Sequence, residues 1–182
     1  MKTLHLLRHA KSAWNDPSLP DHDRPLAPRG ARAATLMGRH LRGQAHSHGQ
    51  KRAQGFAPDV VLCSTARRAA DTAALVLAQL DGRSPPVVHE RDLYLTGSQT
   101  LLERLRKLPD DVGTVLLVAH NPDMQELALS LTGSGDRAEI QSLAAKFPTA
   151  ALATLTFPCD RWSGIGPKGG TLTQFIVPKK LT

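Results

Sequence analysis

Two histidines each stand directly after a short apolar run, with side chains suited to binding an anion nearby. His9 follows Arg8 at the end of the first run, and His120 follows the run from 115 to 119. A third run, 60–63, leads within a few residues into Arg67 and Arg68. Short β-branched-rich runs bounded by turn residues are typical of buried strands in a parallel sheet. Because ligands bind beyond the carboxyl ends of such strands, we expect two imidazoles and up to three guanidiniums at one sheet edge.

These residue types together predict phosphoryl chemistry. A neutral imidazole is a competent nucleophile near neutral pH, because its unperturbed pKa is roughly 6.5. The planar guanidinium of Arg8 matches two phosphate oxygens at once, and fixed cations stabilise a phosphoryl group in transfer. A lone histidine after a strand is more often a turn residue, but two histidines with paired arginines favour catalysis. We therefore predict a covalent phosphohistidine intermediate on His9.

Strand and helix patterns alternate along the chain, as in doubly wound α/β proteins. Helix N-caps are expected at Thr96 or Ser98 and at Asn121, with Pro122 as the first helical residue. We predict one α/β domain over residues 1–182, with a mostly parallel sheet and helices on both faces. The expected strands are 4–7, 59–63, 87–88, 114–119, 150–157 and 171–177, and the expected helices are 29–41, 66–80, 101–108 and 123–131.

Composition limits the class of protein. The chain has 182 residues, of which 41% are hydrophobic, and this suits one domain with a sizeable core. The net charge of +7 comes from scattered basic residues, and only 4% of residues are aromatic, so we expect no nucleic-acid partner. Hydropathy predicts no membrane span, and the start of the chain leaves no room for a signal peptide. With two cysteines, Cys63 and Cys159, the simplest expectation is a reduced, cytoplasmic protein.

Three other kinds of site are weaker interpretations. A metal hydrolase would need convergent ligands, and the nearest candidate is the polar segment containing His46 and His48. A dinucleotide enzyme would need a glycine-rich turn after a strand, whereas Gly164 and Gly166 lie in a late loop. A non-enzymatic phosphate-binding module stays open, although it has no need of a nucleophile beside Arg8. We expect no metal and no cofactor.

Several segments in order along the chain resemble the histidine phosphatase superfamily, the phosphoglycerate-mutase-like group. Within it the chain is most similar to the small SixA-type phosphohistidine phosphatases. The segments that carry the resemblance are 7–15 (LRHAKSAWN), 23–26 (DRPL) with 29–30 (RG), 64–73 (STARRAADTA), 120–122 (HNP) and 146–150 (KFPTA).

The resemblance implies a three-layer α/β/α fold and assigns roles to individual residues. His9 would become phosphorylated, Arg8 and Arg68 would bind the phosphoryl group, and His120 would stabilise the transition state. Arg68 is matched rather than its neighbour, because it stands four residues after Ser64 and four before Thr72. Asn15 fits an asparagine that touches phosphate in many members, and a turn-forming role is an equal alternative. The chain departs from the family pattern at Ala10, Thr65, Asp71 and Ala119.

The proton donor and the substrate are less well defined. Glu90 and Asp92 lie in the segment where many members carry an acid, although surface carboxylates are the default interpretation of both. A leaving imidazole needs less help from an acid than an alkoxide does. The segment 43–55 is too short for the lid that roofs the pocket of mutases. The resemblance implies a protein-borne phosphohistidine, on a phosphorelay partner, as substrate, and a small phosphorylated metabolite is the alternative.

Overall fold

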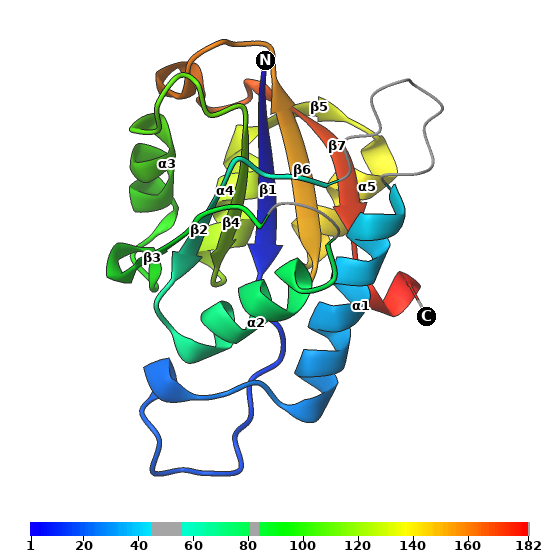
Figure 1. The fold of residues 1–182 in the computed structure, drawn as a ribbon. Helices are drawn as coiled ribbons and strands as arrows, with labels where there is room; N and C mark the ends of the chain where they lie inside the picture. Colours follow the sequence, from blue (N-terminus) through cyan, green and yellow to red (C-terminus); the bar gives the residue numbers. More distant parts are fainter. Residues whose placement is uncertain (45–55, 81–83, 182) are drawn as a thin grey trace.

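The computed structural model describes residues 1–44, 56–80 and 84–181, which form one sheet with helices on both faces (Figure 1). The strand order is β3-β2-β4-β1-β6-β7-β5, and β6 alone runs antiparallel to its neighbours among these strands. The predicted mostly parallel sheet is therefore confirmed. The strands are β1 Lys2–Arg8, β2 Val60–Ser64, β3 Val87–Glu90, β4 Thr114–Ala119, β5 Thr132–Gly135, β6 Leu152–Phe157 and β7 Gly170–Ile176.

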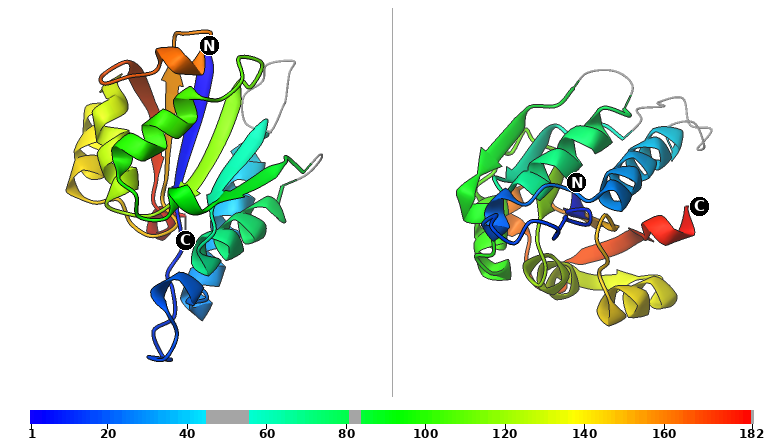
Figure 2. Two further views of the ribbon diagram at one scale, coloured as in Figure 1. Left: turned by 90° about the vertical axis from the view of Figure 1, so that its left-hand side faces the viewer. Right: turned by 90° about the horizontal axis from the view of Figure 1, so that it is seen from below.

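The helices make the outer two layers of the fold. Helices α1 (Pro28–Gln44) and α2 (Arg67–Leu77) cover one face of the sheet. Helices α3 (Ser98–Arg106), α4 (Asp123–Leu131) and α5 (Arg137–Ala145) cover the other, and the turned views of Figure 2 show the two groups apart. The described residues also contain four short 3-10 turns: η1 Asp21–Asp23, η2 Arg91–Leu93, η3 Trp162–Gly164 and η4 Pro178–Lys180.

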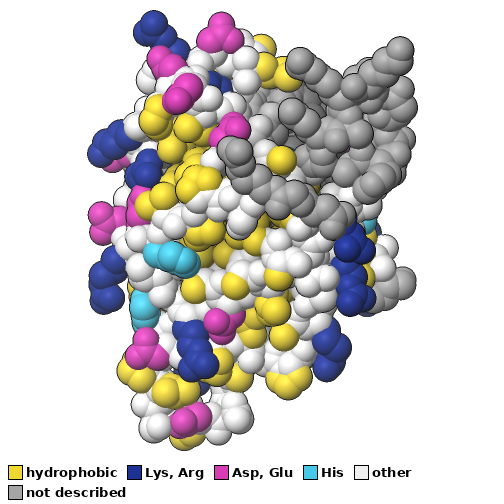
Figure 3. Space-filling model, in the orientation of Figure 1, with side chains coloured by type: hydrophobic (Ala, Val, Ile, Leu, Met, Phe, Trp, Pro, Cys, Tyr) yellow, Lys and Arg dark blue, Asp and Glu magenta, His cyan; other side chains and the backbone are white. Residues whose placement is uncertain are grey.

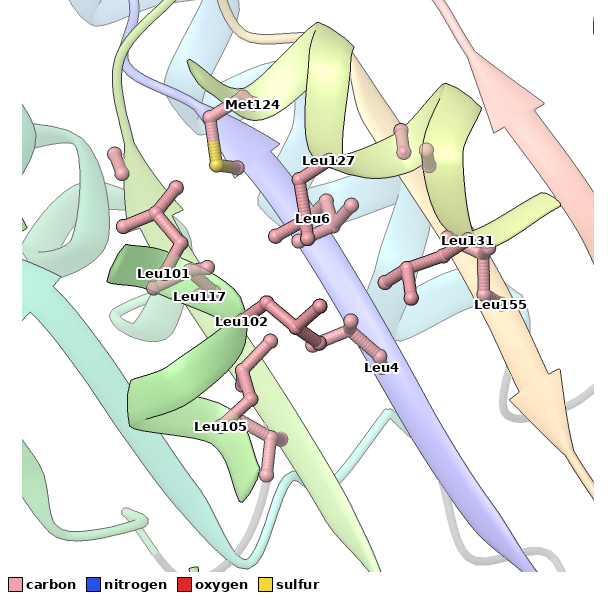
Figure 4. Close-up of a cluster of buried hydrophobic side chains, with 14 of the residues drawn as sticks. Leu4, Leu6, Leu101, Leu102, Leu105, Leu117, Met124, Leu127, Leu131 and Leu155 are labelled. Atoms are coloured by element: carbon pink, nitrogen blue, oxygen red, sulfur yellow. The ribbon is translucent and has the colours of Figure 1, made fainter. Parts of the chain in front are cut away.

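The central strands are predominantly apolar because most of their side chains are buried on one face of the sheet or the other. Successive side chains of a strand point to opposite faces, so Leu6 packs under α3 and α4 while Leu7 packs under α1 and α2. Figure 4 shows the first of these clusters. Its labelled members are Leu4, Leu6, Leu101, Leu102, Leu105, Leu117, Met124, Leu127, Leu131 and Leu155. This packing fixes the strands whose carboxyl ends carry the candidate site.

Two predicted helix caps are wrong. The N-cap of α3 is Gly97, because the Thr96 hydroxyl instead donates to the carbonyl oxygen of Asp92 (2.6 Å) and Ser98 Oγ donates to Glu126 Oε2 (3.2 Å). Helix α4 begins at Asp123 with Pro122 as its N-cap residue, and the Asn121 side chain makes no capping bond. The Asn121 amide instead donates to Gln125 Oε1 (3.2 Å).

Two elements were absent from the prediction, namely strand β5 and helix α5. The single-domain expectation for residues 1–182 stays a prediction. Within the described ranges, no helix has the length and apolar character that crossing a bilayer requires. On the face drawn in Figure 3, basic and acidic side chains are interspersed, and the expected lack of a nucleic-acid partner stays a prediction.

Candidate active site

The two histidines of the predicted site meet at the carboxyl ends of adjacent strands. Strands β1 and β4 are parallel neighbours in which Arg8 pairs with Ala119, so His9 and His120 leave the sheet side by side. The backbone N–H of His9 donates to the carbonyl oxygen of Ala119 (3.1 Å). The two ring centroids lie 4.9 Å apart with the planes inclined by 48°. Both histidines are buried, with 8% and 1% of their surface exposed.

The ring of His9 is held in one orientation by its own backbone. Its Nδ1 lies 2.8 Å from the carbonyl oxygen of Ala10, which can only accept, so Nδ1 carries the proton and Nε2 keeps a free lone pair. The pKa of His9 is lowered to about 4, first by burial and then by the positive charges of Arg68 and Arg8. The ring is therefore neutral at physiological pH, as a nucleophile must be.

His120 is held by the end of a third strand. Its Nε2 lies 2.8 Å from Ser64 Oγ at the end of β2. Ser64 Oγ also accepts from the backbone N–H of Ala66 (3.3 Å), so we assign its hydroxyl hydrogen to His120 Nε2 and the ring proton to Nδ1. Nδ1 is buried and has no hydrogen-bond partner within the described part of the chain. Burial lowers the pKa of His120 to about 3, followed by the influence of His9 and Arg68.

The two arginines at the start of α2 lie in different environments. The Arg68 side chain is 6% exposed, and its guanidinium bonds Asp21. The Arg67 side chain is 59% exposed and pairs with Asp71 one helical turn along (3.8 Å). Helix α2 thus turns Arg68 toward the histidines and Arg67 toward solvent. The buried arginine is the one that the family spacing matched.

Arg8 is positioned by the segment that precedes β6. Its Nη1 donates to the carbonyl oxygen of Phe147 (2.6 Å), and the Asn121 amide donates weakly to the same oxygen (3.4 Å). The backbone N–H of Ala150 bonds the carbonyl oxygens of Arg8 (3.0 Å) and His9 (3.2 Å). Arg8 Nε is buried and has no partner among the described residues, so it can still donate to an anion.

Sequence reasoning missed two residues of this site, Asp21 and Tyr94. Asp21 Oδ2 accepts from Arg68 Nη2 (2.8 Å) and from the Tyr94 hydroxyl (2.7 Å). The Tyr94 ring meets the His120 ring edge-on, with centroids 5.2 Å apart. Asp21 lies in η1, in a loop rich in proline and aspartate, where spacing offers no signal of a contact with α2.

Similarity to known proteins identifies the family of the chain. A model described as the histidine phosphatase superfamily (branch 1) matches residues 4–94. The chain belongs to the histidine phosphatase superfamily. An uncharacterized protein of Mycobacterium tuberculosis is 38% identical to it over 176 residues, covering 95% of this chain and 100% of that protein.

Solved structures extend the likeness over nearly the whole fold. A protein from Nakamurella multipartitia and one from Agrobacterium tumefaciens are provisionally described as phosphohistidine phosphatases SixA. They are 30% and 27% identical, each with a TM-score of 0.77, and cover 97% of this chain and 96% and 98% of theirs. A protein histidine phosphatase SixA complexed with tungstate shares the fold at 24% identity and a TM-score of 0.74, covering 99% of both chains. The phosphoglycerate-mutase-like fold is thus confirmed.

For three residues that the resemblance assigned to the site, the described residues show no side-chain contact with His9 or His120. Asn15 is exposed in the loop after β1 and makes no hydrogen bond to another described residue. Both carboxylate oxygens of Glu90 are bound by Arg104, at 2.7 and 2.8 Å. Asp92 is exposed in η2. Phosphate binding by Asn15 and proton donation by Glu90 or Asp92 stay predictions without a supporting contact.

The metal-site alternative finds no support in residues 1–44, 56–80 and 84–181. No group of three or more histidine, cysteine, aspartate or glutamate side chains there could hold a metal ion. His46 and His48 lie outside the described residues. That the chain needs no metal and no cofactor stays a prediction.

Proposed function

We propose that the chain is a phosphatase that forms a covalent phosphohistidine on His9 and removes phosphate from a protein-borne phosphohistidine. The observation that carries the proposal is the fixed tautomer of His9. Its Nδ1 is bound to the Ala10 carbonyl oxygen at 2.8 Å, which leaves the lone pair of Nε2 at a site lined by His120 and Arg68. A site that merely binds phosphate has no need of this lone pair.

The first step transfers the phosphoryl group to the enzyme. The Nε2 lone pair of His9 attacks phosphorus, a new P–N bond forms, and the P–N bond to the substrate imidazole breaks with its electron pair going to the leaving ring. In the transition state, negative charge is spread over the phosphoryl oxygens. Arg8, Arg68 and the Nδ1–H of His120 are placed to donate to those oxygens.

The second step regenerates the enzyme. A water molecule attacks the same phosphorus, the bond to His9 Nε2 breaks, and the electron pair returns to Nε2. Oxygen from water stays with phosphorus, and the protons of the water leave with phosphate and solvent. The same donors serve both steps, because the phosphoryl group is transferred twice at one place.

A phosphohistidine substrate is supported by the bonding of the acids near the site, because none of those described is free to donate a proton. Glu90 is bound by Arg104, and Asp21 is bound by Arg68 and Tyr94, so no carboxylic acid of the described ranges contacts His9 or His120 as a ready proton donor. An alkoxide needs a proton to leave, whereas an imidazole does not need a strong acid. The 30% identical relative described as a SixA protein points in the same direction.

The test compares substrates and the nucleophile directly. Hydrolysis of a phosphohistidine-bearing protein, free phosphohistidine, phosphoserine and p-nitrophenyl phosphate is measured with the parent protein and with His9→Ala. We expect higher kcat/KM for the phosphohistidine substrates and loss of nearly all turnover in His9→Ala. Equal turnover by His9→Ala would refute the covalent mechanism. A preference for phosphoserine would refute the substrate while leaving the mechanism intact.

A further inference from the structure

One carboxylate links the arginine and the tyrosine that flank the two histidines. The Arg68 guanidinium donates to the backbone carbonyl oxygen of Asp21 and, from Nη2, to its Oδ2 at 2.8 Å. The Tyr94 hydroxyl donates to the same Oδ2 at 2.7 Å. The Tyr94 ring in turn packs edge-on against His120, and the Arg68 guanidinium lies 5.7 Å from the Tyr94 ring centroid.

The other oxygen of this carboxylate is available to a ligand. Asp21 Oδ1 has no hydrogen bond to another described residue, and the side chain is 43% exposed. Burial alone would raise the pKa of Asp21, but hydrogen bonds from Tyr94 and Arg68 and the guanidinium charge outweigh it and lower that pKa. Asp21 is therefore an acceptor at neutral pH, and it cannot serve as a proton donor there.

The charge of Asp21 acts on the place where the phosphoryl group would bind. Among the acidic side chains of the described ranges, it is the one whose charge raises the pKa of both His9 and His120. A phosphoryl group held by Arg68 between these histidines would therefore lie close to the carboxylate that binds Arg68. A carboxylate there repels anionic leaving groups and attracts N–H groups.

We propose that Asp21 is a specificity-determining residue, whose free Oδ1 accepts the ring N–H of a substrate phosphohistidine; this rests on the proposed function. A phosphoimidazole has one ring nitrogen bonded to phosphorus and a second nitrogen that can carry a proton. The hydrogen bond keeps the second nitrogen protonated. When the P–N bond breaks, its electron pair goes to the first nitrogen, and the ring leaves as neutral imidazole. The leaving group thus needs no separate acid.

The test is Asp21→Asn, which replaces one carboxylate oxygen by an NH₂ donor and removes the charge. An amide oxygen can still accept from Arg68 and Tyr94, so the NH₂ would face the substrate ring. The measured quantity is the ratio of kcat/KM for free phosphohistidine to kcat/KM for p-nitrophenyl phosphate, whose leaving group has no N–H and needs no acid. We expect Asp21→Asn to lower this ratio at least about tenfold.

Two matched variants separate specificity from positioning and from charge. Asp23→Asn removes a carboxylate from the same 3-10 turn, where Asp23 pairs with His22 rather than Arg68, and should leave the ratio unchanged. Tyr94→Phe removes a hydrogen bond to Oδ2 and should affect both substrates alike.

An equal loss of both activities in Asp21→Asn, or an unchanged ratio, would overturn the specificity role while the proposed function survived. Absence of phosphohistidine turnover in the parent protein would instead overturn the proposed function itself, and this inference with it.

Discussion

Two consecutive arginines have opposite environments at the start of α2. A helix advances by about 100° per residue, so one side chain of such a pair can point inward while the next points to solvent. Arg68 binds Asp21 of η1, and its charge acts on both histidines, whereas Arg67 forms an exposed pair with Asp71. Because Arg68 is buried close to the two histidines and Arg67 is exposed, we expect the functional role to belong to Arg68.

This difference predicts the outcome of a pair of substitutions. Arg68→Ala should lower kcat/KM by about 100- to 1,000-fold, because it removes a fixed cation from the transferring phosphoryl group. Arg67→Ala should change kcat/KM by less than about threefold. Steady-state kinetics with p-nitrophenyl phosphate measures both. Equal effects of the two variants would show that the wrong arginine was assigned.

Among the elements, the contact between α1 and the loop after β1 fixes the approach to His9. The backbone of Gly30 lies so close to Lys11 that a Cβ on Gly30 would overlap the Lys11 carbonyl oxygen. That same oxygen accepts the backbone N–H of Ala27 at 2.8 Å, so it cannot move away freely. Lys11 stands two residues after His9, and the helix therefore supports the loop that follows the proposed nucleophile.

Gly30→Ala should destabilise the protein by about 1–3 kcal/mol and lower kcat, since the added methyl group must displace backbone beside the site. Gly43→Ala in the same helix is the control. Among the described residues, no atom lies within 4 Å of a Cβ built at Gly43, and alanine has the higher helix propensity, so this variant should be neutral or stabilised by up to about 1 kcal/mol. Urea unfolding measures both, and a Gly30→Ala protein as stable as the parent would contradict this account of the contact.

The elements that could be predicted are those with a clear hydrophobic pattern. The apolar runs that became β1, β2 and β4 are unambiguous because they are buried on both faces. Strand β5 is the sequence TGSG at a sheet edge, which has low strand propensity and forms only by pairing with β7. Helix α5 did carry a signal that was overlooked: Asp136 caps it by accepting from the Glu139 backbone N–H (3.0 Å), three residues on.

The residues of the candidate site also divide into those that the sequence predicts and those that it does not. Both histidines and Arg68 could be predicted because strand ends and family spacing place them. Asp21 and Tyr94 could not, because their contacts join η1, α2 and the segment after β3, which are distant in sequence. The capping bond expected of Ser98 was lost to Glu126, a partner distant in sequence, whereas the Thr96 hydroxyl bonds the carbonyl oxygen of Asp92 four residues back.

For the whole molecule, three histidines whose pKa values lie below the ordinary range link stability to pH. Burial lowers the pKa of His5 to about 4, as it lowers those of His9 to about 4 and His120 to about 3. The unfolded chain takes up protons near pH 6.5, whereas the folded protein does not until the pH is far lower. Stability should therefore be independent of these groups above pH 7 and should fall as the pH drops below 6.5.

Each of these histidines should remove about 1.4 kcal/mol of unfolding free energy per pH unit below 6.5, until the pH nears its folded pKa. Urea unfolding at pH 7, 6 and 5 measures the slope. His5 lies in the middle of β1, outside the site, and a glutamine there can keep a hydrogen bond to Thr154. His5→Gln should therefore reduce the slope by about 1.4 kcal/mol per pH unit, the contribution of one histidine. A stability that is flat between pH 7 and 5 would show that the three rings are not buried as neutral groups.

The most direct test of the central claim is to trap the phosphorylated enzyme. The protein is mixed with radiolabelled phosphohistidine substrate, quenched in alkali within one turnover, and digested, and the labelled peptide is identified by mass spectrometry. We expect acid-labile, alkali-stable phosphate on the peptide containing His9, and none in His9→Ala. Turnover without any such phosphoenzyme, or with the label on His120 instead, would contradict the account.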